Sequence, residues 1–165
     1  MRIARLVGAA VIGASGILLS ATPSNAADIA ACRNAPGDAN CTGAQIKRHD
    51  ACWENSRVVA ARAYSELGWN FLTTLRWSQQ CQSNFAVTEL TSLDILHSPY
   101  YELRNKVRRH AGPNGPYRML YAPWARLTGD VGSLVISPLV WSPTNPAEAC
   151  LSIRSNDQVV CTEAI

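Results

Sequence analysis

The stretch KRHDACWEN, residues 47–55, sets His49 directly beside Asp50, with Cys52 two residues further on. A histidine can act as a general base, and a neighbouring carboxylate can bind a calcium ion. Such a pair does chemistry only where the fold holds the histidine in a cleft, facing a second carboxylate. The alternative is that His49 and Asp50 are polar surface residues beside a disulfide. The sequence favours this alternative, because it shows no residues that would complete a catalytic site.

Other residues capable of catalysis lack partners as well. His97 and His110 have no acid or nucleophile at a suggestive spacing, and Ser78 lies in no Gly-x-Ser-x-Gly turn. We therefore expect no catalytic residues and no cofactor in this chain.

The cysteines indicate how the chain is held together. All six lie after residue 26: Cys32, Cys41, Cys52, Cys81, Cys150 and Cys161. An even number in an exported chain is typical of structural disulfides, and the absence of a Cys-x-x-Cys pair argues against a metal site. Six cysteines can be paired in 15 ways, and the sequence does not choose among them. Our hypothesis is Cys32–Cys41 and Cys150–Cys161, which close short loops, and then Cys52–Cys81 by elimination.

The first residues are typical of a secretory signal peptide. Two arginines precede an apolar run, Leu6–Leu19, and small residues up to Ala26 follow it. The run is shorter than the ~20 apolar residues that a membrane-spanning helix needs, so we expect no stable membrane insertion. The predicted organisation is a signal peptide, residues 1–26, and a single secreted, disulfide-bonded domain, residues 27–165.

The net charge gives little indication of a partner. The chain has 15 Lys and Arg against 12 Asp and Glu, a formal net charge of +3. Cleavage after Ala26 would remove Arg2 and Arg5 and leave 13 − 12 = +1. So small a positive charge does not suggest a nucleic-acid partner.

Short runs of strand-forming residues predict the fold. In WNFLTTLRWSQQC, residues 69–81, large and polar side chains alternate with the period of a strand, and NFAVTEL is a second candidate. Later runs are separated by Pro and Gly: YRMLYA, SLVI, PLVW, CLSI and QVVCT. The sequence therefore predicts an all-β, disulfide-stabilised sandwich or small barrel with one or two short helices.

Three further segments complete the expected organisation. Residues 27–45 contain few large apolar side chains, so we expect a loop pinned by two cysteines. Residues 46–67 are compatible with either a helix or a strand, because a seven-residue apolar period coexists with Val58 and Val59. YYELRNKVRRH, residues 100–110, is the best candidate for a helix inserted among the strands.

A motif near the middle of the chain resembles a known family. Its central part consists of Leu75, Arg76, Trp77, Ser78, Cys81 and Ala86. Its upstream part consists of Cys41, Gly43, Cys52, Val58 and Val59. The motif resembles the YjfA-like family of small exported bacterial proteins, a family whose domain has no known function. Phe85 stands where the family has Trp, and Val87 where it has Arg, so any role of that arginine is lost here. The resemblance implies export and a β-rich, disulfide-held domain, and it implies no reaction.

The run from Arg48 to Asn55 is similar to a motif of bacterial secreted phospholipases A2. That resemblance implies that His49 activates water and that Asp50 helps to bind calcium. The family also needs a glycine-rich calcium loop upstream and a second helix downstream. CTGAQI is a poor calcium loop, and a strand is predicted where the second helix would be. We therefore expect no phospholipase activity, and we keep a calcium-dependent hydrolase as the alternative.

A basic and aromatic segment is the remaining feature. Between Arg104 and Arg126 there are six Lys or Arg and no acid, with tyrosines and a tryptophan between them. Cations beside aromatic rings suit anionic polymers and sugars, through charge and through stacking. The alternative is a solvated basic face whose aromatic residues belong to the core. The candidate ligand-binding residues are Arg108, Arg109, Arg118, Tyr121 and Trp124.

These patterns favour a non-catalytic extracellular or cell-envelope domain that has a binding or structural role. The expected partner is an anionic cell-envelope polymer or glycan, and neither nucleic acid nor a metal ion. A further alternative is a secreted scaffold that binds or inhibits another protein.

Overall fold

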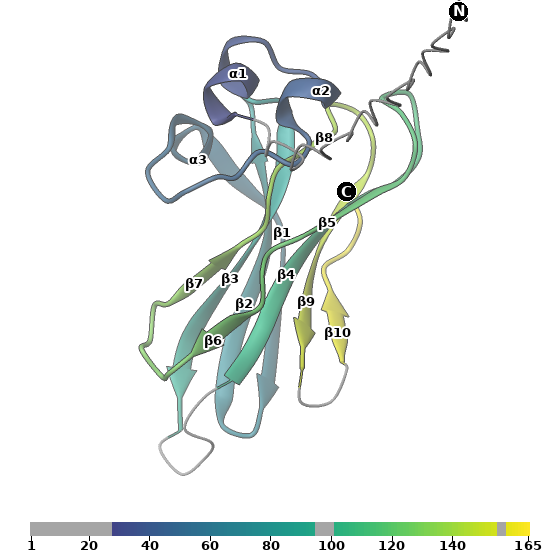
Figure 1. Cartoon of the computed structure of the whole chain (residues 1–165). Coiled ribbons are helices and arrows are strands. Elements are labelled where there is room, and N and C mark those ends of the chain that lie inside the picture. Colours follow the sequence, from purple (N-terminus) through teal and green to yellow (C-terminus); the bar gives the residue numbers. More distant parts are fainter. Residues whose placement is uncertain (1–27, 95–100, 155–157) are drawn as a thin grey trace, which may run out of the picture.

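The computed structural model describes residues 28–94, 101–154 and 158–165 (Figure 1). The predicted signal peptide, His97 and Tyr100 lie outside the described residues. Within the described ranges, no helix is long and apolar enough to cross a membrane.

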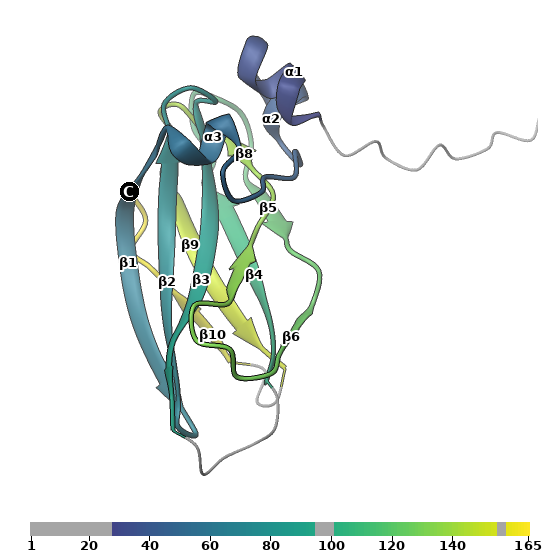
Figure 2. The ribbon, with the colours of Figure 1, turned by 90° about the vertical axis from the view of Figure 1, so that its left-hand side faces the viewer.

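Two antiparallel sheets pack face to face, and three short helices cover one end of them (Figures 1 and 2). The prediction of a β-sandwich with short helices is therefore confirmed. Apolar side chains from both sheets fill the space between them, and one cluster of them includes Trp69, Phe71, Leu90, Leu103, Leu151 and Ile153.

The first sheet contains three long strands and two short ones. Its order is β1-β2-β3-β7, and β8 also pairs with β3. The strands are β1 (Ser56–Glu66), β2 (Trp69–Ser78), β3 (Ser83–Leu93), β7 (Leu134–Ile136) and β8 (Val140–Trp141). The two strands predicted from WNFLTTLRW and NFAVTEL are β2 and β3.

The second sheet is built around β4. Its order is β10-β9-β4-β5, and β6 also pairs with β4. The strands are β4 (Tyr101–Arg109), β5 (Arg118–Tyr121), β6 (Ala125–Leu127), β9 (Ala147–Ile153) and β10 (Val159–Cys161).

Strand β4 corrects the prediction of a helix at residues 100–110. Arginine and lysine form helices readily, and this propensity suggested a helix. The period of the segment is that of a strand, because Leu103 and Val107 face the core while the basic residues between them alternate outward. Burial of the apolar positions between two sheets therefore outweighs the local helix propensity.

The segment before the sheets is more helical than expected. Residues 27–45 were predicted to form a loop, but they include α1 (Ile29–Asn34) and α2 (Asp38–Cys41). The Asp28 side chain caps α1 by accepting a hydrogen bond of 2.9 Å from the backbone N–H of Ala30. The ambiguous stretch after it contains one helical turn, α3 (Ala51–Glu54), and then enters β1.

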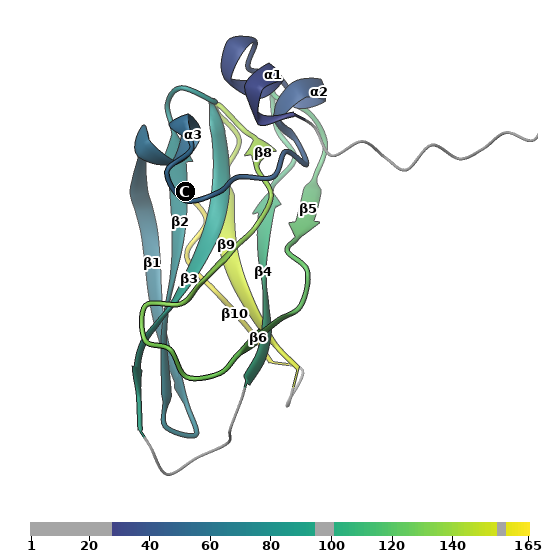
Figure 3. The same cartoon turned by 60° about the vertical axis from the view of Figure 1, so that its left-hand side comes forward.

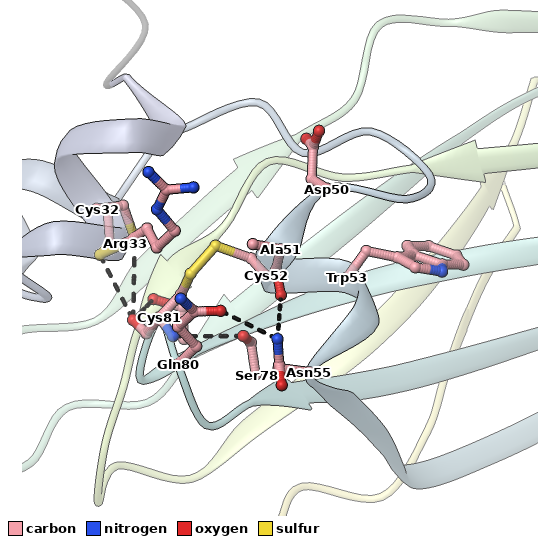
Figure 4. The surroundings of a disulfide bond; sticks show 12 residues. Cys32, Arg33, Asp50, Ala51, Cys52, Trp53, Asn55, Ser78, Gln80 and Cys81 are labelled. Atoms are coloured by element: carbon pink, nitrogen blue, oxygen red, sulfur yellow. Dashed lines mark hydrogen bonds between the residues drawn. A yellow bond between two sulfur atoms is a disulfide. The ribbon is translucent and has the colours of Figure 1, made fainter.

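The three predicted disulfides are confirmed. Cys32–Cys41 joins α1 to α2, Cys52–Cys81 joins α3 to the turn between β2 and β3, and Cys150–Cys161 joins β9 to β10. Figure 4 shows the second of these bonds, which anchors the helical end to the first sheet. Three disulfides indicate that the chain folds in an oxidising compartment.

Candidate functional site

The two sides of β4 carry different kinds of residue. Leu103, Asn105, Val107 and Arg109 face the interior, where all four are buried. Arg104, Lys106 and Arg108 alternate with them, so they lie on the outer side of the second sheet. Consecutive members of this outer row are roughly 7 Å apart along the strand.

Two exposed aromatic rings stand beside the outer row. The Arg104 guanidinium carbon lies 4.7 Å from the centre of the Tyr121 ring and 4.6 Å from the centre of the Trp124 ring. The Lys106 ammonium lies 5.6 Å from the Tyr121 ring centre. Contacts between cations and aromatic faces are favourable at these distances. We call this surface, formed by Arg104, Lys106, Arg108, Tyr121 and Trp124, the cation–aromatic face.

Of the three cations in the outer row, only Arg108 has an acidic partner among the described residues. It pairs with Glu148 at 3.0 Å, and Glu102, the neighbouring acid of β4, pairs with Arg154 at 2.8 Å. Among the described residues, Arg104 and Lys106 have no carboxylate within salt-bridge distance. Three buried polar atoms on the same side lack a hydrogen-bond partner in this part of the chain: Arg104 Nε, Arg108 Nε and Ser152 Oγ.

Lys106 occupies the centre of the face. It lies in register with Tyr121 on one side and with Cys150, of the Cys150–Cys161 disulfide, on the other. These neighbours leave the residue only 9% exposed. Burial lowers the pKa of the Lys106 ammonium below its ordinary 10.5, and repulsion from Arg104 and Arg108 lowers it further. The protein therefore holds this positive charge at a cost.

This arrangement suits an anionic ligand. Each oxygen of a phosphate or carboxylate group could accept hydrogen bonds from the Lys106 ammonium and the neighbouring guanidinium groups. It would also relieve the repulsion among the three cations. The rings of Tyr121 and Trp124, which are 39% and 40% exposed, add apolar surface for a ligand backbone to pack on.

The structure divides the five predicted ligand-binding residues into two groups. Arg108, Tyr121 and Trp124 belong to the cation–aromatic face. Arg109 does not, because its side chain is fully buried. Arg118 pairs with Arg109 in register, so it lies on the same side of the sheet as Arg109 and away from the face.

Arg109 is a structural residue, which corrects its prediction as a ligand-binding residue. Its Nη1 donates to Asp38 Oδ1 at 2.7 Å and to the Trp141 carbonyl at 2.5 Å. Its Nη2 donates to the Pro116 carbonyl at 3.0 Å. The side chain thus ties α2, β8 and the loop before β5 to β4.

Arg104 and Lys106 were not selected from the sequence. The signal that finds them is the alternation in LRNKVRR, which places them with Arg108 on one side of a strand. This signal was hidden by the interpretation of residues 100–110 as a helix, which would put consecutive basic residues on different faces.

His49 and Asp50 do not form the arrangement that the phospholipase resemblance requires. His49 lies in a turn with a positive φ of 71° and not on a helix. Its side chain is 75% exposed and contacts Glu54 at 2.9 Å. Asp50 accepts a hydrogen bond of 2.7 Å from the backbone N–H of Lys47 and points away from the disulfide beside it (Figure 4). Asp50 lines a small hollow of about 100 Å³ with Ile29, Ala30, Arg33, Ala51 and Cys52, and His49 is not among the lining residues.

The described residues that come close enough to hold a metal ion are mostly disulfide cysteines. One group is Cys32, Cys52 and Cys81, and the other is Glu148, Cys150 and Cys161. Because these cysteines are oxidised in pairs, they offer no thiolate ligands. Neither group is therefore suited to binding a metal.

Comparison of the chain with protein-family models, with curated proteins and with solved structures finds no match. The resemblance to the YjfA-like family therefore stays a prediction. The candidate site depends on the geometry of the chain itself.

Proposed function

We propose that this protein is a secreted, non-catalytic domain that binds an anionic cell-envelope polymer through its cation–aromatic face. One observation carries the proposal. Lys106 and Arg104 are two neighbouring cations without a carboxylate partner in the described chain, and both lie beside aromatic rings on an outer sheet surface.

The cations form a row and do not converge on one point. Arg104 and Lys106 lie roughly 7 Å apart along one strand, and Arg108, which already pairs with Glu148, follows at the same interval. A ligand that pairs with both Arg104 and Lys106 therefore carries at least two anionic groups at a matching spacing. A linear polymer with phosphate or carboxylate in each repeat fits this pattern better than one small anion. The aromatic rings then contact the uncharged parts of the repeat.

The expected location of the protein is compatible with such a partner. Disulfides persist in oxidising surroundings, which include the outside of a cell. The resemblance to exported bacterial proteins and the predicted signal peptide point to the same place. An exported bacterial domain meets the anionic polymers of the cell envelope first.

Binding to a purified poly(glycerol phosphate) teichoic acid tests the proposal. Titration calorimetry is carried out at about 50 mM and at about 500 mM salt, since exposed charges are screened over only a few ångströms at high salt. We expect affinity to fall steeply with salt. The variant Arg104→Gln should bind weakly at low salt, and Trp124→Ala should lose the binding that persists at high salt.

A matched control separates local from general charge. Arg62→Gln removes one exposed arginine from β1 in the first sheet, and it should bind like the parent protein. Equal losses in Arg62→Gln and Arg104→Gln would mean that net charge alone drives binding. That result, or a parent protein that does not bind, would refute the cation–aromatic face as the site.

A further inference from the structure

A groove opens between the sheets at the end covered by the helices. Its volume is about 300 Å³, and a neighbouring hollow that shares Arg57 and Trp77 extends it. The groove is lined by Arg57, Val59, Trp77, Asn84, Ser142, Pro143, Thr144, Asn145 and Ile165. Figures 2 and 3 show the C-terminus near the upper end of the first sheet, and its last residue, Ile165, lines the groove.

Three of these residues form a row across the first sheet. Arg57 of β1 pairs with Trp77 of β2, and Trp77 pairs with Asn84 of β3. Residues paired directly lie on the same side of a sheet, so all three side chains share the side that faces the groove. The next row on that side is apolar, with Leu75 paired to Ala86 in the core. The lining therefore changes from apolar to polar at this row.

The row carries hydrogen-bonding groups that the fold does not use. Asn84 is 5% exposed and donates through Nδ2 to Ser142 Oγ at 2.7 Å, while its Oδ1 accepts no hydrogen bond from the described residues. Trp77 Nε1 donates none in the same part of the chain, and Arg57 has no carboxylate or other polar partner there. The groove thus presents an acceptor, an indole N–H and a guanidinium group together.

These groups distinguish among ligands. A small anion would pair with Arg57 but would face the Asn84 oxygen, which repels it. An apolar ligand would leave the Asn84 oxygen and the Arg57 guanidinium without partners, which costs free energy. A sugar ring offers a hydroxyl donor for Asn84 Oδ1 and an apolar face for the Trp77 ring. A carboxylate on that sugar would accept a charge-assisted hydrogen bond from Arg57.

The geometry points to a second binding site in this groove, for a saccharide unit that carries a carboxylate. The volume is at the lower end of the range for small-molecule sites, which suits one or two rings. The site shares no residue with the cation–aromatic face, so it stands independently of the function proposed for that face.

Calorimetric titration with two trisaccharides tests this site. Trigalacturonic acid carries a carboxylate on each ring, and cellotriose carries none. We expect the acidic trisaccharide to bind the parent protein about tenfold more tightly than the neutral one, the size of effect expected for a charge-assisted hydrogen bond. The variant Arg57→Gln should bind both with the affinity of the neutral sugar, and Trp77→Leu should weaken both.

Controls locate the binding within the molecule. Arg62→Gln removes the next arginine of β1 and should bind trigalacturonic acid like the parent protein. Trigalacturonic acid could also bind the cation–aromatic face, so the titrations are repeated in Lys106→Met, where binding at the groove should persist. Circular dichroism establishes whether Trp77→Leu is folded, and Arg57→Gln, an exposed position, decides the question if it is not. The inference fails if neither sugar binds, if both bind the parent protein equally, or if adding Arg57→Gln to Lys106→Met leaves the preference for the acidic sugar unchanged.

Discussion

The inner and outer sides of β4 use positive charge in opposite ways. On the inner side, the guanidinium of Arg109 is fully buried, and hydrogen bonds tie it to Asp38, Trp141 and Pro116. On the outer side, Lys106 is almost as well covered but has no carboxylate partner among the described residues. A buried cation with a complete set of partners holds the fold together. A covered cation without them lowers stability and leaves its hydrogen-bonding capacity free for a ligand.

Asn105 extends this comparison along the inner side. It accepts a hydrogen bond of 2.6 Å from Thr88 Oγ1, and it donates to the carbonyl of Val135. Thr88 in turn shares a hydrogen bond of 2.8 Å with Thr73. This network joins β4 of the second sheet to β2 and β3 of the first. These polar groups of the inner side are therefore partners of one another, whereas Arg104 and Lys106 on the outer side have no acidic partner among the described residues.

The largest effect should come from Arg109→Met. The change leaves two backbone carbonyls and the Asp38 carboxylate without their donor, and loss of one partner from a buried ion pair costs about 3 kcal/mol. Urea unfolding followed by circular dichroism measures the difference. Arg62→Met is the control, since its side chain is exposed on β1 and its loss should cost less than about 1 kcal/mol. Equal stabilities of the two variants would show that Arg109 does not hold the fold.

A smaller loss should follow from Asn105→Leu. Leucine has a similar size, but it leaves Thr88 and the Val135 carbonyl unsatisfied in the interior, at a cost of about 2 kcal/mol. The free energy of unfolding in urea gives the value. A second variant, Thr88→Val, removes the other member of the hydrogen bond, and the two losses should not add because they share it. Fully additive losses would contradict a connected network.

Low pH should reduce the free energy of unfolding by protonating Asp38, the partner of Arg109 on the inner side of β4. Partial burial raises the pKa of this carboxyl, but hydrogen bonds from Thr42 and Arg109 and attraction to Arg109 and Arg118 lower it more, so it lies below its ordinary 3.8. A carboxyl with a lowered pKa contributes stability above about pH 4, which is lost as the pH falls through the folded-state pKa. The stability advantage of the parent over Asp38→Asn should therefore shrink in acid.

The measurement is the free energy of unfolding of both proteins between about pH 5 and about pH 2. The control is Asp130→Asn, at an exposed aspartate without an ion pair in the described chain. Its free energy of unfolding should change with pH in the same way as that of the parent. A constant difference between the parent and Asp38→Asn across this range would mean that the Asp38–Arg109 pair does not stabilise the fold.

Local sequence patterns predicted strand β2 and the three disulfides. The alternation around Phe71, Thr73 and Leu75 identifies β2 because one side of that strand is buried along its length. The disulfides followed from loop length, since Cys32–Cys41 and Cys150–Cys161 each close a loop within one small unit. Such features depend on residues close in sequence, and so the sequence displays them directly.

The binding face depends on relations that are not local. Arg108 and Arg109 are neighbours in sequence, yet one is at the surface and the other is buried, because a strand turns successive residues to opposite sides. Recognising this requires knowing that residues 101–109 form a strand, and their helix propensity concealed it. The contacts of Arg104 with Tyr121 and Trp124 arise only once β5 and β6 pair with β4.

The substitution Lys106→Met tests most directly whether the outer side of β4 serves binding and not folding. Because the folded state lowers the pKa of Lys106 below 10.5, the charged form is disfavoured there, and stability rises as the pH rises from the lowered pKa towards 10.5. An uncharged side chain removes this cost at neutral pH. We therefore measure two quantities on the same variant at pH 7, the free energy of unfolding and the affinity for poly(glycerol phosphate). We expect unfolding to become no easier and affinity to fall about tenfold. A variant that unfolds more easily and binds the polymer as tightly as the parent would contradict this.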